Sequence, residues 1–444
     1  MKKKNILFWL CIFPLSLLAQ QRWTLKDCIS YGLKNNRSTQ VYLNEKKIAD
    51  ALAKEVLSDH LPKVTLNGTL DNNLKLQESV IPAGVFGPEP TRIAFTQKYN
   101  TNLTAQVDQT LFDYAIITGI KAKKYNTRKA DLNIEQSQES IIYNISNAYF
   151  QIYVYRKQLL LLEGNLNIYR KQIEVSKLQV EKGVILKKDL DKVTVDYNNA
   201  VSQIRIAQSN LTLAENELKY EMGYPFKDSL AIDSLAQKDV EEGLMRGATN
   251  RSFAVNQRVE YQFSQVESQL LFLDQKRIRA GMYPKLSVYA RYGAVSFGNE
   301  LKPALTDFSP FSVVGLKLNI PILDFFKTNA QYNQAKYKSL NALETLKMDE
   351  GKYQMEYENA RAEITRSRSN LEDEKRNIEL AQSVFEVTNL QYNKGTTDLT
   401  DWITAQNSIK EAQNNYLTSL YSFYQAKIDL EKAGGTLKTF YTSL

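Results

Sequence analysis

The residue types that most often perform catalysis or bind metals are scarce in this chain of 444 residues, which has one histidine and two cysteines. His60 stands two positions before Pro62, where a surface or capping role explains it. The sequence contains no glycine-rich phosphate loop, no nucleophile elbow and no pair of carboxylates at a pocket-like spacing. This leaves little room for a zinc site, a disulfide framework or a histidine-based active centre. We therefore expect a protein that is not an enzyme and uses no cofactor.

The N-terminus has the three parts of a secretory signal peptide. Lysines follow the first methionine, an apolar run covers 6–18, and a plausible cleavage site lies at Ala19. The apolar run is shorter than the roughly twenty residues that a membrane-spanning helix needs, which disfavours a transmembrane anchor. Neither Cys11 nor Cys28 fits a lipid-attachment site. We predict that residues 1–19 are removed and that the mature chain works outside the cytoplasm.

The charge of the chain gives no indication of nucleic-acid binding. Cleavage of the signal peptide would lower the formal net charge from +8 to +5, because it removes three lysines and no acidic residue. The remaining basic residues alternate with acidic ones along predicted helices, as on a solvated coiled-coil face. No clustered basic patch is present, so a nucleic-acid partner is not expected.

Two long stretches without proline, 113–183 and 324–395, are the main elements of the sequence. In the first, apolar residues recur at alternating steps of three and four, which predicts a heptad seam against a partner helix. Only Ser176 interrupts this row, whose members are Ile145, Ala148, Ile152, Tyr155, Leu159, Leu162, Leu166, Tyr169, Ile173 and Val180. A helix of about seventy residues would be about 105 Å long. Ordinary globular helices are much shorter.

Shorter helices and four strands fill the rest of the chain. Helical patterns cover 24–58 and 239–280, and each ends before a proline. Four segments alternate apolar and polar residues, which predicts β-strands. These strands lie at about 63–72, 98–110, 285–295 and 311–321. We expect loops over 77–98 and 297–310 between the members of each strand pair.

Landmarks of the first half recur in the second half at a nearly constant spacing. The segment Leu-Gln-x-x-Lys-Gly that ends at Gly183 recurs 212 residues later, ending at Gly395, and Gly223 maps to Gly435 at the same offset. Pro62 maps to a second proline at an offset of 222. The spacing indicates an internal duplication of the order helix–strand–strand–helix–helix. The two predicted repeats cover 20–236 and 237–444.

Helix lengths indicate how these repeats pair. Helices over 183–223 and 395–435 are only a little more than half as long as the two long stretches. Each long helix would therefore pack against two half-length helices placed end to end. The segments 224–240 and 434–444 would lie together at the break, midway along the long helices.

The four predicted strands have the length of tilted strands that cross a bilayer. Aromatic residues lie near their ends, where interfacial girdles belong: Tyr99, Phe112, Tyr283, Tyr292, Phe311, Phe325 and Phe326. A small soluble sheet is the alternative. Because lipid cannot satisfy the open edges of a four-stranded sheet, such a sheet could span a membrane only by closing with other copies. Three chains would give twelve strands.

The order of elements, the duplication and the two Leu-Gln-x-x-Lys-Gly segments resemble the TolC family of outer-membrane efflux and secretion channels, over nearly the whole mature chain. The resemblance implies a mainly α fold with membrane β: a homotrimer with a twelve-stranded outer-membrane β-barrel, continued by a long periplasmic α-helical barrel. It also implies a passive exit duct of a tripartite efflux or type I secretion system. An inner-membrane pump would energise it through a periplasmic adaptor (membrane fusion) protein.

The resemblance further implies two functional regions at the periplasmic tips. Adaptor docking would involve the tip residues, which plain helix C-caps would also explain: Lys182, Gly183, Val184, Lys394, Gly395 and Thr396. Asp189 and Tyr392 match a gate that holds the pore closed, and Asp401 matches one position of an acidic ring that would favour cations. The alternative for both aspartates is stabilisation of a helix N-terminus.

This sequence departs from the gate pattern at two places. Thr397 stands at the arginine position and Thr404 at the second acidic position. The gate would therefore be weaker, or would be built from Lys187 and Lys188.

Two other functions remain open at this point. A secreted coiled-coil scaffold or adhesin would have the long helices without a channel. A periplasmic adaptor would have helical hairpins, but it would lack the duplicated strand pairs. The cargo of a duct, whether drug, metal ion or protein, is not indicated by the sequence.

Overall fold

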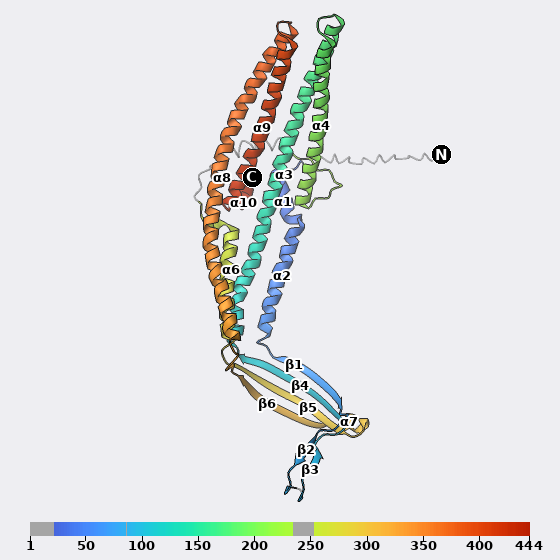
Figure 1. Ribbon diagram of the computed structural model, residues 1–444, viewed down its shortest axis with the longest axis vertical. Coiled ribbons are helices and arrows are strands. Elements are labelled where there is room, and N and C mark those ends of the chain that lie inside the picture. The colour runs from blue at the N-terminus through green and yellow to red at the C-terminus, as the bar shows by residue number, and fades with distance from the viewer. Residues whose placement is uncertain (1–21, 86, 234–252) are drawn as a thin grey trace, which may run out of the picture. The chain divides into compact units, whose positions relative to one another are not determined.

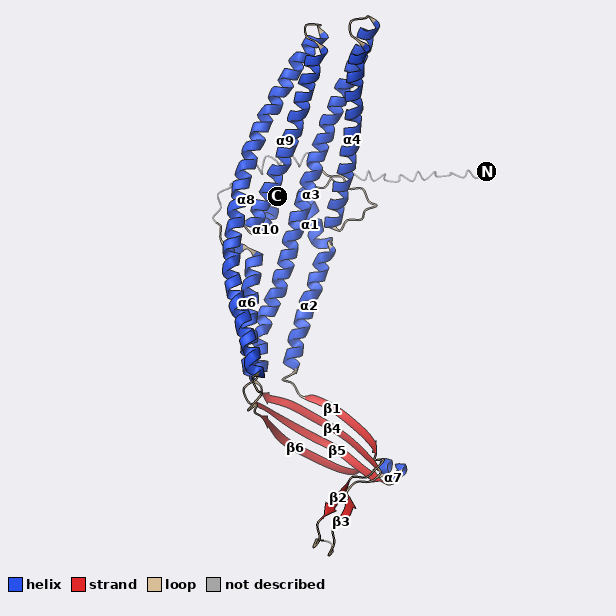
Figure 2. Cartoon of the chain, in the orientation of Figure 1, coloured by secondary structure: helices blue, strands red, loops and turns tan. Residues whose placement is uncertain are grey.

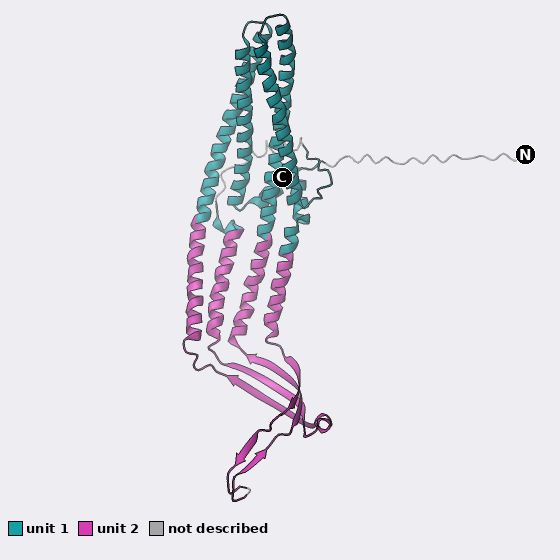
Figure 3. Cartoon of the chain, turned by 45° about the vertical axis from the view of Figure 1, so that its right-hand side comes forward, with its two compact units in different colours: residues 1–41, 135–258, 352–444 teal, residues 42–134, 259–351 magenta. Residues whose placement is uncertain are grey.

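The computed structural model describes residues 22–85, 87–233 and 253–444. The predicted signal peptide and the start of the helix predicted from residue 239 lie outside this part. The chain divides into two compact units, one of 1–41, 135–258 and 352–444 and the other of 42–134 and 259–351 (Figure 3). Each unit combines segments from both predicted repeats.

The first unit is helical and contains the hairpin turns. Its elements are α1 (Leu25–Asn35), α4 (Lys187–Met222), η1 (Val255–Gln257), α9 (Leu399–Ala433), α10 (Leu437–Ser443) and the C-terminal parts of α3 (Tyr114–Glu181) and α8 (Lys327–Asn393) (Figure 1). The apolar row predicted along α3 is buried or half-buried throughout. A member of this row, Tyr169, packs against Trp402 of α9 with ring centroids 6.1 Å apart. Next to the row, Phe150 stacks on Tyr424 of α9 with ring centroids 4.4 Å apart. None of the described helices has a stretch long and apolar enough to cross a bilayer.

The predicted continuous helix over 24–58 is wrong in one respect, because it is broken into α1 and α2 (Arg37–Ser58). Asn36 adopts an extended backbone with ψ of 130°. Its side-chain amide donates to the carbonyl oxygen of Glu221 (2.7 Å), and its side-chain oxygen accepts from the Ser38 backbone N–H (2.9 Å). A side chain that bonds to backbone groups in this way competes with helix formation. The break therefore follows from the hydrogen bonds of the Asn36 side chain, one within the segment and one to a carbonyl group distant in the sequence.

The second unit carries the main sheet, together with most of α2, α6 (Val259–Ala280) and the N-terminal parts of α3 and α8. Its main sheet is antiparallel in the order β1-β4-β5-β6, formed by β1 (Lys63–Asn72), β4 (Tyr99–Phe112), β5 (Lys285–Gly298) and β6 (Ser309–Asn319) (Figure 2). The expectation that 77–98 and 297–310 are plain loops is wrong. The first holds a hairpin of β2 (Glu78–Ile81) and β3 (Thr91–Ala94), and the second contains the short helix α7 (Leu301–Thr306).

The register of the main sheet places its apolar residues on one face. Val64 pairs with Val107, which pairs with Ala290, which in turn pairs with Val314. Directly opposed residues lie on the same face of a sheet. Val64 and Val314, on the two outermost strands, are both largely exposed. The chain by itself therefore presents an uncovered apolar sheet face.

Two helix ends are built in the same way in the first unit. Gly223, at the end of α4, has a φ of +67°, and a Cβ there would lie 2.7 Å from the carbonyl oxygen of Asn35. Gly435, after α9, has the same φ, and its Cβ would lie 2.7 Å from the carbonyl oxygen of Gln257. Both positions require glycine, because the backbone is left-handed and another backbone is in close contact.

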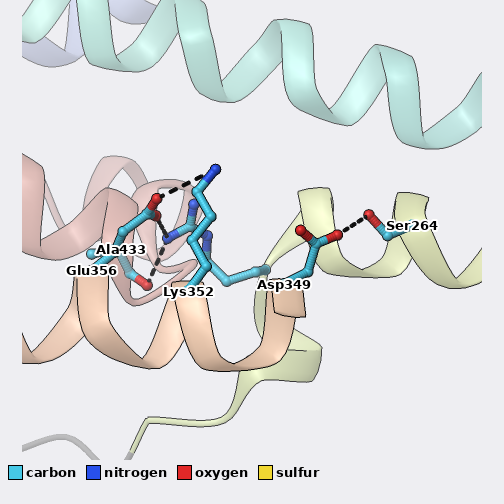
Figure 4. A network of polar contacts seen from close by, with 6 residues as sticks. Ser264, Asp349, Lys352, Glu356 and Ala433 are labelled. Carbon is cyan, nitrogen blue, oxygen red and sulfur yellow. Dashed lines mark hydrogen bonds and ion pairs between the residues drawn. The ribbon is translucent and has the colours of Figure 1, made fainter. Parts of the chain in front are cut away.

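Each of these junctions also has a side chain that bonds to the end of the neighbouring helix. At the first junction, the side-chain amide of Asn36 donates to the carbonyl oxygen of Glu221. At the second, the nearly fully buried guanidinium of Arg258 donates to the carbonyl oxygen of Ala433 (3.1 Å) and to the carboxylate of Glu356 (3.3 Å) (Figure 4). The buried charge of Arg258 at the second junction is thus balanced by a carboxylate, and the guanidinium also bonds to a carbonyl group at a helix C-terminus.

Candidate functional site

The two hairpin turns are helix C-caps closed by glycine. Gly183 has a φ of +70° and Gly395 a φ of +73°. After each glycine, a backbone N–H bonds back to the last turn of the helix: Val184 to Gln179 (2.8 Å) and Thr396 to Gln391 (3.0 Å). This pattern satisfies helix carbonyls that would otherwise lack a partner. It requires a residue that tolerates the left-handed region.

Every residue predicted to form the tips is exposed: Lys182, Gly183, Val184, Lys394, Gly395 and Thr396. Space around both glycines is open, because an added Cβ would meet no atom within 4 Å. Val184 and, two residues later, Leu186 expose most of their apolar side chains beside exposed Lys187 and Lys188. The first turn is therefore an accessible surface of mixed apolar and basic character.

The predicted gate residue Tyr392 links the two hairpins. Its side chain is buried, and its hydroxyl donates to Gln179 Oε1 across a distance of 2.9 Å. This bond joins the last turn of α8 to the last turn of α3. Gln179 belongs to the repeated Leu-Gln-x-x-Lys-Gly segment, so the sequence identified the segment but not this role.

Asp189 and Tyr392, which match the predicted gate, both lie in the described part of the chain, and no hydrogen bond joins them there. Asp189 lies in the first turn of α4, and its carboxylate accepts instead from Lys192 Nζ (3.4 Å), one turn along the same helix. Side chains three positions apart on a helix are neighbours. Asp189 therefore has a partner on its own helix.

Asp401 and Thr397 are brought together at the start of α9. The hydroxyl of Thr397 donates to the Asp401 carboxylate (2.6 Å), and the backbone N–H of Asp401 donates to the N-cap residue Asp398 (2.9 Å). Carboxylates in the first turn stabilise a helix N-terminus. The threonine at the predicted arginine position thus still contacts Asp401, through a hydrogen bond from a hydroxyl to a carboxylate in place of an ion pair.

An aromatic cluster behind the tips was missed by the sequence reasoning. Trp402 is fully buried, and its ring lies 6.1 Å from Tyr169 of α3 and 6.0 Å from Phe385 of α8. Its indole N–H donates to Asn389 Oδ1 (2.9 Å). Burial raises the pKa of the Tyr169 hydroxyl, which stays protonated. Trp402 is one of three tryptophans in the chain. Because large aromatic residues dominate the energetics of cores, it could have indicated a buried cluster here.

A buried amide cluster lies between this aromatic cluster and the main core. Asn165 of α3 donates to Gln413 Oε1 (2.7 Å) and accepts from Gln406 Nε2 (3.4 Å), both of α9. All three side chains are buried. Such bonds specify the register of two helices, because a shifted register would leave buried amides without partners. The heptad pattern did not indicate this cluster.

Comparisons with known proteins agree with the architecture. The family model for outer membrane efflux proteins matches residues 29–223 and 272–436. The outer membrane protein TolC of Salmonella enteritidis is 22% identical over 346 residues, which cover 76% of this chain and 69% of that protein. Nodulation protein T of Rhizobium leguminosarum bv. trifolii is 21% identical over 417 residues, which cover 88% of this chain and 80% of that protein.

Solved structures of outer-membrane channels share the fold at low sequence identity. The Campylobacter jejuni CmeC channel superimposes with a TM-score of 0.75 at 16% identity, covering 93% of this chain and 86% of the channel. CusC, described as forming a transmembrane channel, superimposes with a TM-score of 0.74 at 17% identity, covering 94% and 95% of the two chains.

Proposed function

The chain belongs to the outer membrane efflux protein family, whose members are passive channels of the outer membrane, and from this premise we propose that it forms the exit duct of a tripartite efflux or type I secretion system. An inner-membrane pump supplies the energy through a periplasmic adaptor. The observation that carries the proposal is the sheet with an uncovered apolar face and two open edges. Family membership disfavours the two alternatives from the sequence, a secreted scaffold and a periplasmic adaptor.

The open edges of the sheet support a trimer. β1 and β6 each have one hydrogen-bonded neighbour in the sheet order β1-β4-β5-β6. Lipid offers no partner to the backbone groups of an open edge, so β6 of one chain must pair with β1 of the next. Three chains close a barrel of twelve strands. Fractionation of membranes and detergent gels without heating test this, and a soluble monomer would overturn the proposal.

Repeat contacts support an internal duplication of the chain. Asn36 and Arg258 are 222 residues apart, the offset that also separates the two prolines noted in the sequence. The carbonyl groups that they contact, of Glu221 and Ala433, are 212 residues apart, the offset of the tip glycines. A hydrogen bond from a side chain to the carbonyl group at a helix end thus occurs in both halves, at the spacing of the sequence landmarks.

The helices also carry apolar rows that a second copy would cover. On α4, Ile206, Leu213 and Tyr220 are spaced by seven residues, and all three are largely exposed. An exposed heptad row on a long helix is the seam for a partner helix. We assign this row to the contact with the next chain of the trimer.

Replacing Leu213 with glutamate is expected to weaken the trimer. Loss of the leucine burial alone costs about 1.5–3 kcal/mol per interface. The fraction of trimer on unheated detergent gels, at several protein concentrations, measures the effect. Gln208→Glu is the matched control, because Gln208 is exposed on the same helix and outside the row. An equal loss of trimer in both variants would contradict the assignment of the seam.

The tips are the proposed gate and docking region. The adaptor binds the exposed turn with Val184 and Leu186, whose apolar side chains and neighbouring lysines suit an amphipathic partner. The hydrogen bond between Tyr392 and Gln179 holds the hairpins of one chain together in the closed state. Three Asp401 carboxylates around the pore axis favour cations.

Replacing Tyr392 with phenylalanine is expected to raise single-channel conductance in planar bilayers. The variant keeps the buried ring and removes one hydrogen bond between the hairpins, worth about 1 kcal/mol. Asp189→Asn is the comparison. This variant is expected to change the conductance less, because the Asp189 carboxylate has its partner on its own helix. Unchanged conductance in both variants would refute the gate residues and leave the duct itself intact.

A further inference from the structure

The main sheet has a second face, opposite to its apolar one, that carries polar and charged side chains. Successive residues of a strand point to opposite faces, so this second face holds the neighbours of Val64, Val107, Ala290 and Val314. We call it the inner face, because the apolar face is the one that meets lipid in an outer-membrane protein. In the proposed barrel its side chains line the lumen.

Two adjacent rows of the inner face bring an arginine and a tyrosine together. Read across β1, β4, β5 and β6, one row is Lys63, Asp108, Tyr289 and Gly315, and the next is Thr65, Gln106, Arg291 and Val313. Tyr289 and Arg291 are two residues apart on β5 and therefore share this face. β5 has a hydrogen-bonded neighbour on each side, so the pair lies away from the open edges of the sheet (Figure 2).

Gly315 of β6 makes room for the ring of Tyr289. A Cβ at Gly315 would lie 2.6 Å from Cζ and from the hydroxyl oxygen of this tyrosine. The ring therefore reaches from β5 across the neighbouring strand. The guanidinium carbon of Arg291 lies 5.0 Å from the centre of the same ring, within the range of a cation–π contact. The tyrosine thus holds the guanidinium in place on the inner face.

The guanidinium of Arg291 has no anionic partner among the described residues. It makes neither a hydrogen bond nor an ion pair with them, and its Nε is buried without a hydrogen-bond acceptor. A guanidinium carries several N–H donors and no acceptor. Charged groups that are partly withdrawn from water are normally paired. An anion from outside the chain would supply the missing acceptor.

The acidic residue of these two rows does not fill this role. Both carboxylate oxygens of Asp108 accept from Gln106 Nε2, at 2.9 and 2.8 Å. Lys63 lies beside Asp108 in the register, and the next row toward the end of β6 adds Lys317. The inner face around Arg291 therefore carries three cations and one carboxylate that is already hydrogen-bonded. Such a surface attracts anions.

We propose that Arg291 and Tyr289 form a binding site for permeating organic anions that carry a carboxylate or sulfonate on an aromatic ring. The planar fork of a guanidinium matches the two oxygens of such a group, and its face stacks on aromatic rings. The inference rests on the proposed channel function, because it assigns a class of cargo that the lumen favours. It does not depend on Asp401, which lies in the other compact unit.

Block of single-channel current by naphthalenesulfonate tests the site. The parent protein is reconstituted in planar bilayers, and the probe is added on the side of the sheet, from which it reaches the lumen without passing the gate. We expect a block that increases with probe concentration. R291Q should raise the concentration for half block about tenfold or more, because charge-assisted hydrogen bonds are lost. R291K should lie between the two, since it keeps the charge without the planar fork.

Arg92→Gln is the matched control. It removes the same charge from β3, outside the main sheet, where Arg92 is exposed. This variant should be blocked as the parent is. The reversal potential in a salt gradient gives a second readout, and it should shift toward cations in R291Q and stay unchanged in Arg92→Gln.

Three outcomes would overturn the proposal. The first is equal block of the parent, R291Q and Arg92→Gln. The second is a block by naphthylmethylammonium as strong as that by the sulfonate, which would show stacking without recognition of charge. If R291Q does not fold, Lys317→Gln serves, since Lys317 is exposed on the same face, and an unchanged block in it is the third. A parent protein that forms no channels would refute the proposed function itself, whereas channels without block refute this inference alone.

Discussion

Replacing Trp402 with alanine is expected to loosen both hairpin tips and to hold the channel in a more open state. The side chain is fully buried and contacts the rings of Tyr169, Phe385 and Tyr392. Removing a buried aromatic side chain from a core costs about 3–5 kcal/mol, because the cavity closes only in part. This cluster joins α3, α8 and α9, so the loss affects the packing between hairpins.

Two measurements report this effect. Limited proteolysis with mass spectrometry should show faster cleavage near Gly183 and Gly395, and bilayer recordings should show a higher conductance than for Tyr392→Phe. Trp402→Phe is the matched control, because it keeps most of the ring contacts and loses only the hydrogen bond to Asn389. If the tips of Trp402→Ala resist protease as well as those of the parent protein, the structural role of the cluster is contradicted.

Replacing Gly435 with valine is expected to prevent correct folding of the first unit. A Cβ at this position would lie 2.7 Å from the carbonyl oxygen of Gln257, and the φ of +67° is unfavourable for a β-branched residue. The left-handed conformation alone costs roughly 1–2 kcal/mol. The clash adds to this cost, because the Cβ meets backbone atoms and no rotation of the side chain can relieve it. Gly223→Val should behave in the same way, since its surroundings are equivalent.

The yield of heat-modifiable trimer in the outer membrane and resistance to protease measure this prediction. Gly164→Val is the control, because Gly164 lies within α3, has no neighbour within 4 Å of an added Cβ, and has no positive φ. Valine is a somewhat better helix former than glycine, so the control should be neutral or slightly more stable. Equal yields from Gly435→Val and Gly164→Val would show that the junction tolerates a side chain.

Much of the fold could be predicted because its elements have strong local patterns. Stretches without proline predicted α3 and α8, a heptad row supported α3, and alternation predicted the four strands of the main sheet. The break at Asn36 was not predicted, because it depends on the carbonyl group of Glu221, which is distant in the sequence. The hairpin of β2 and β3 was taken for a loop, since Pro and Gly are frequent there and its strands have four residues each.

By itself, the sequence determined the long helices, the strands with one apolar face, the two glycine turns and the resemblance to an outer-membrane channel family. The tertiary structure alone decided which side chains meet. Tyr392 bonds to Gln179, Asp189 bonds to its own helix, and Trp402 holds three helices together. The physical reason is that periodicity specifies which face of a helix is buried. The partner that a side chain reaches depends on how neighbouring helices are placed and rotated, and many contacts distant in the sequence set that arrangement together.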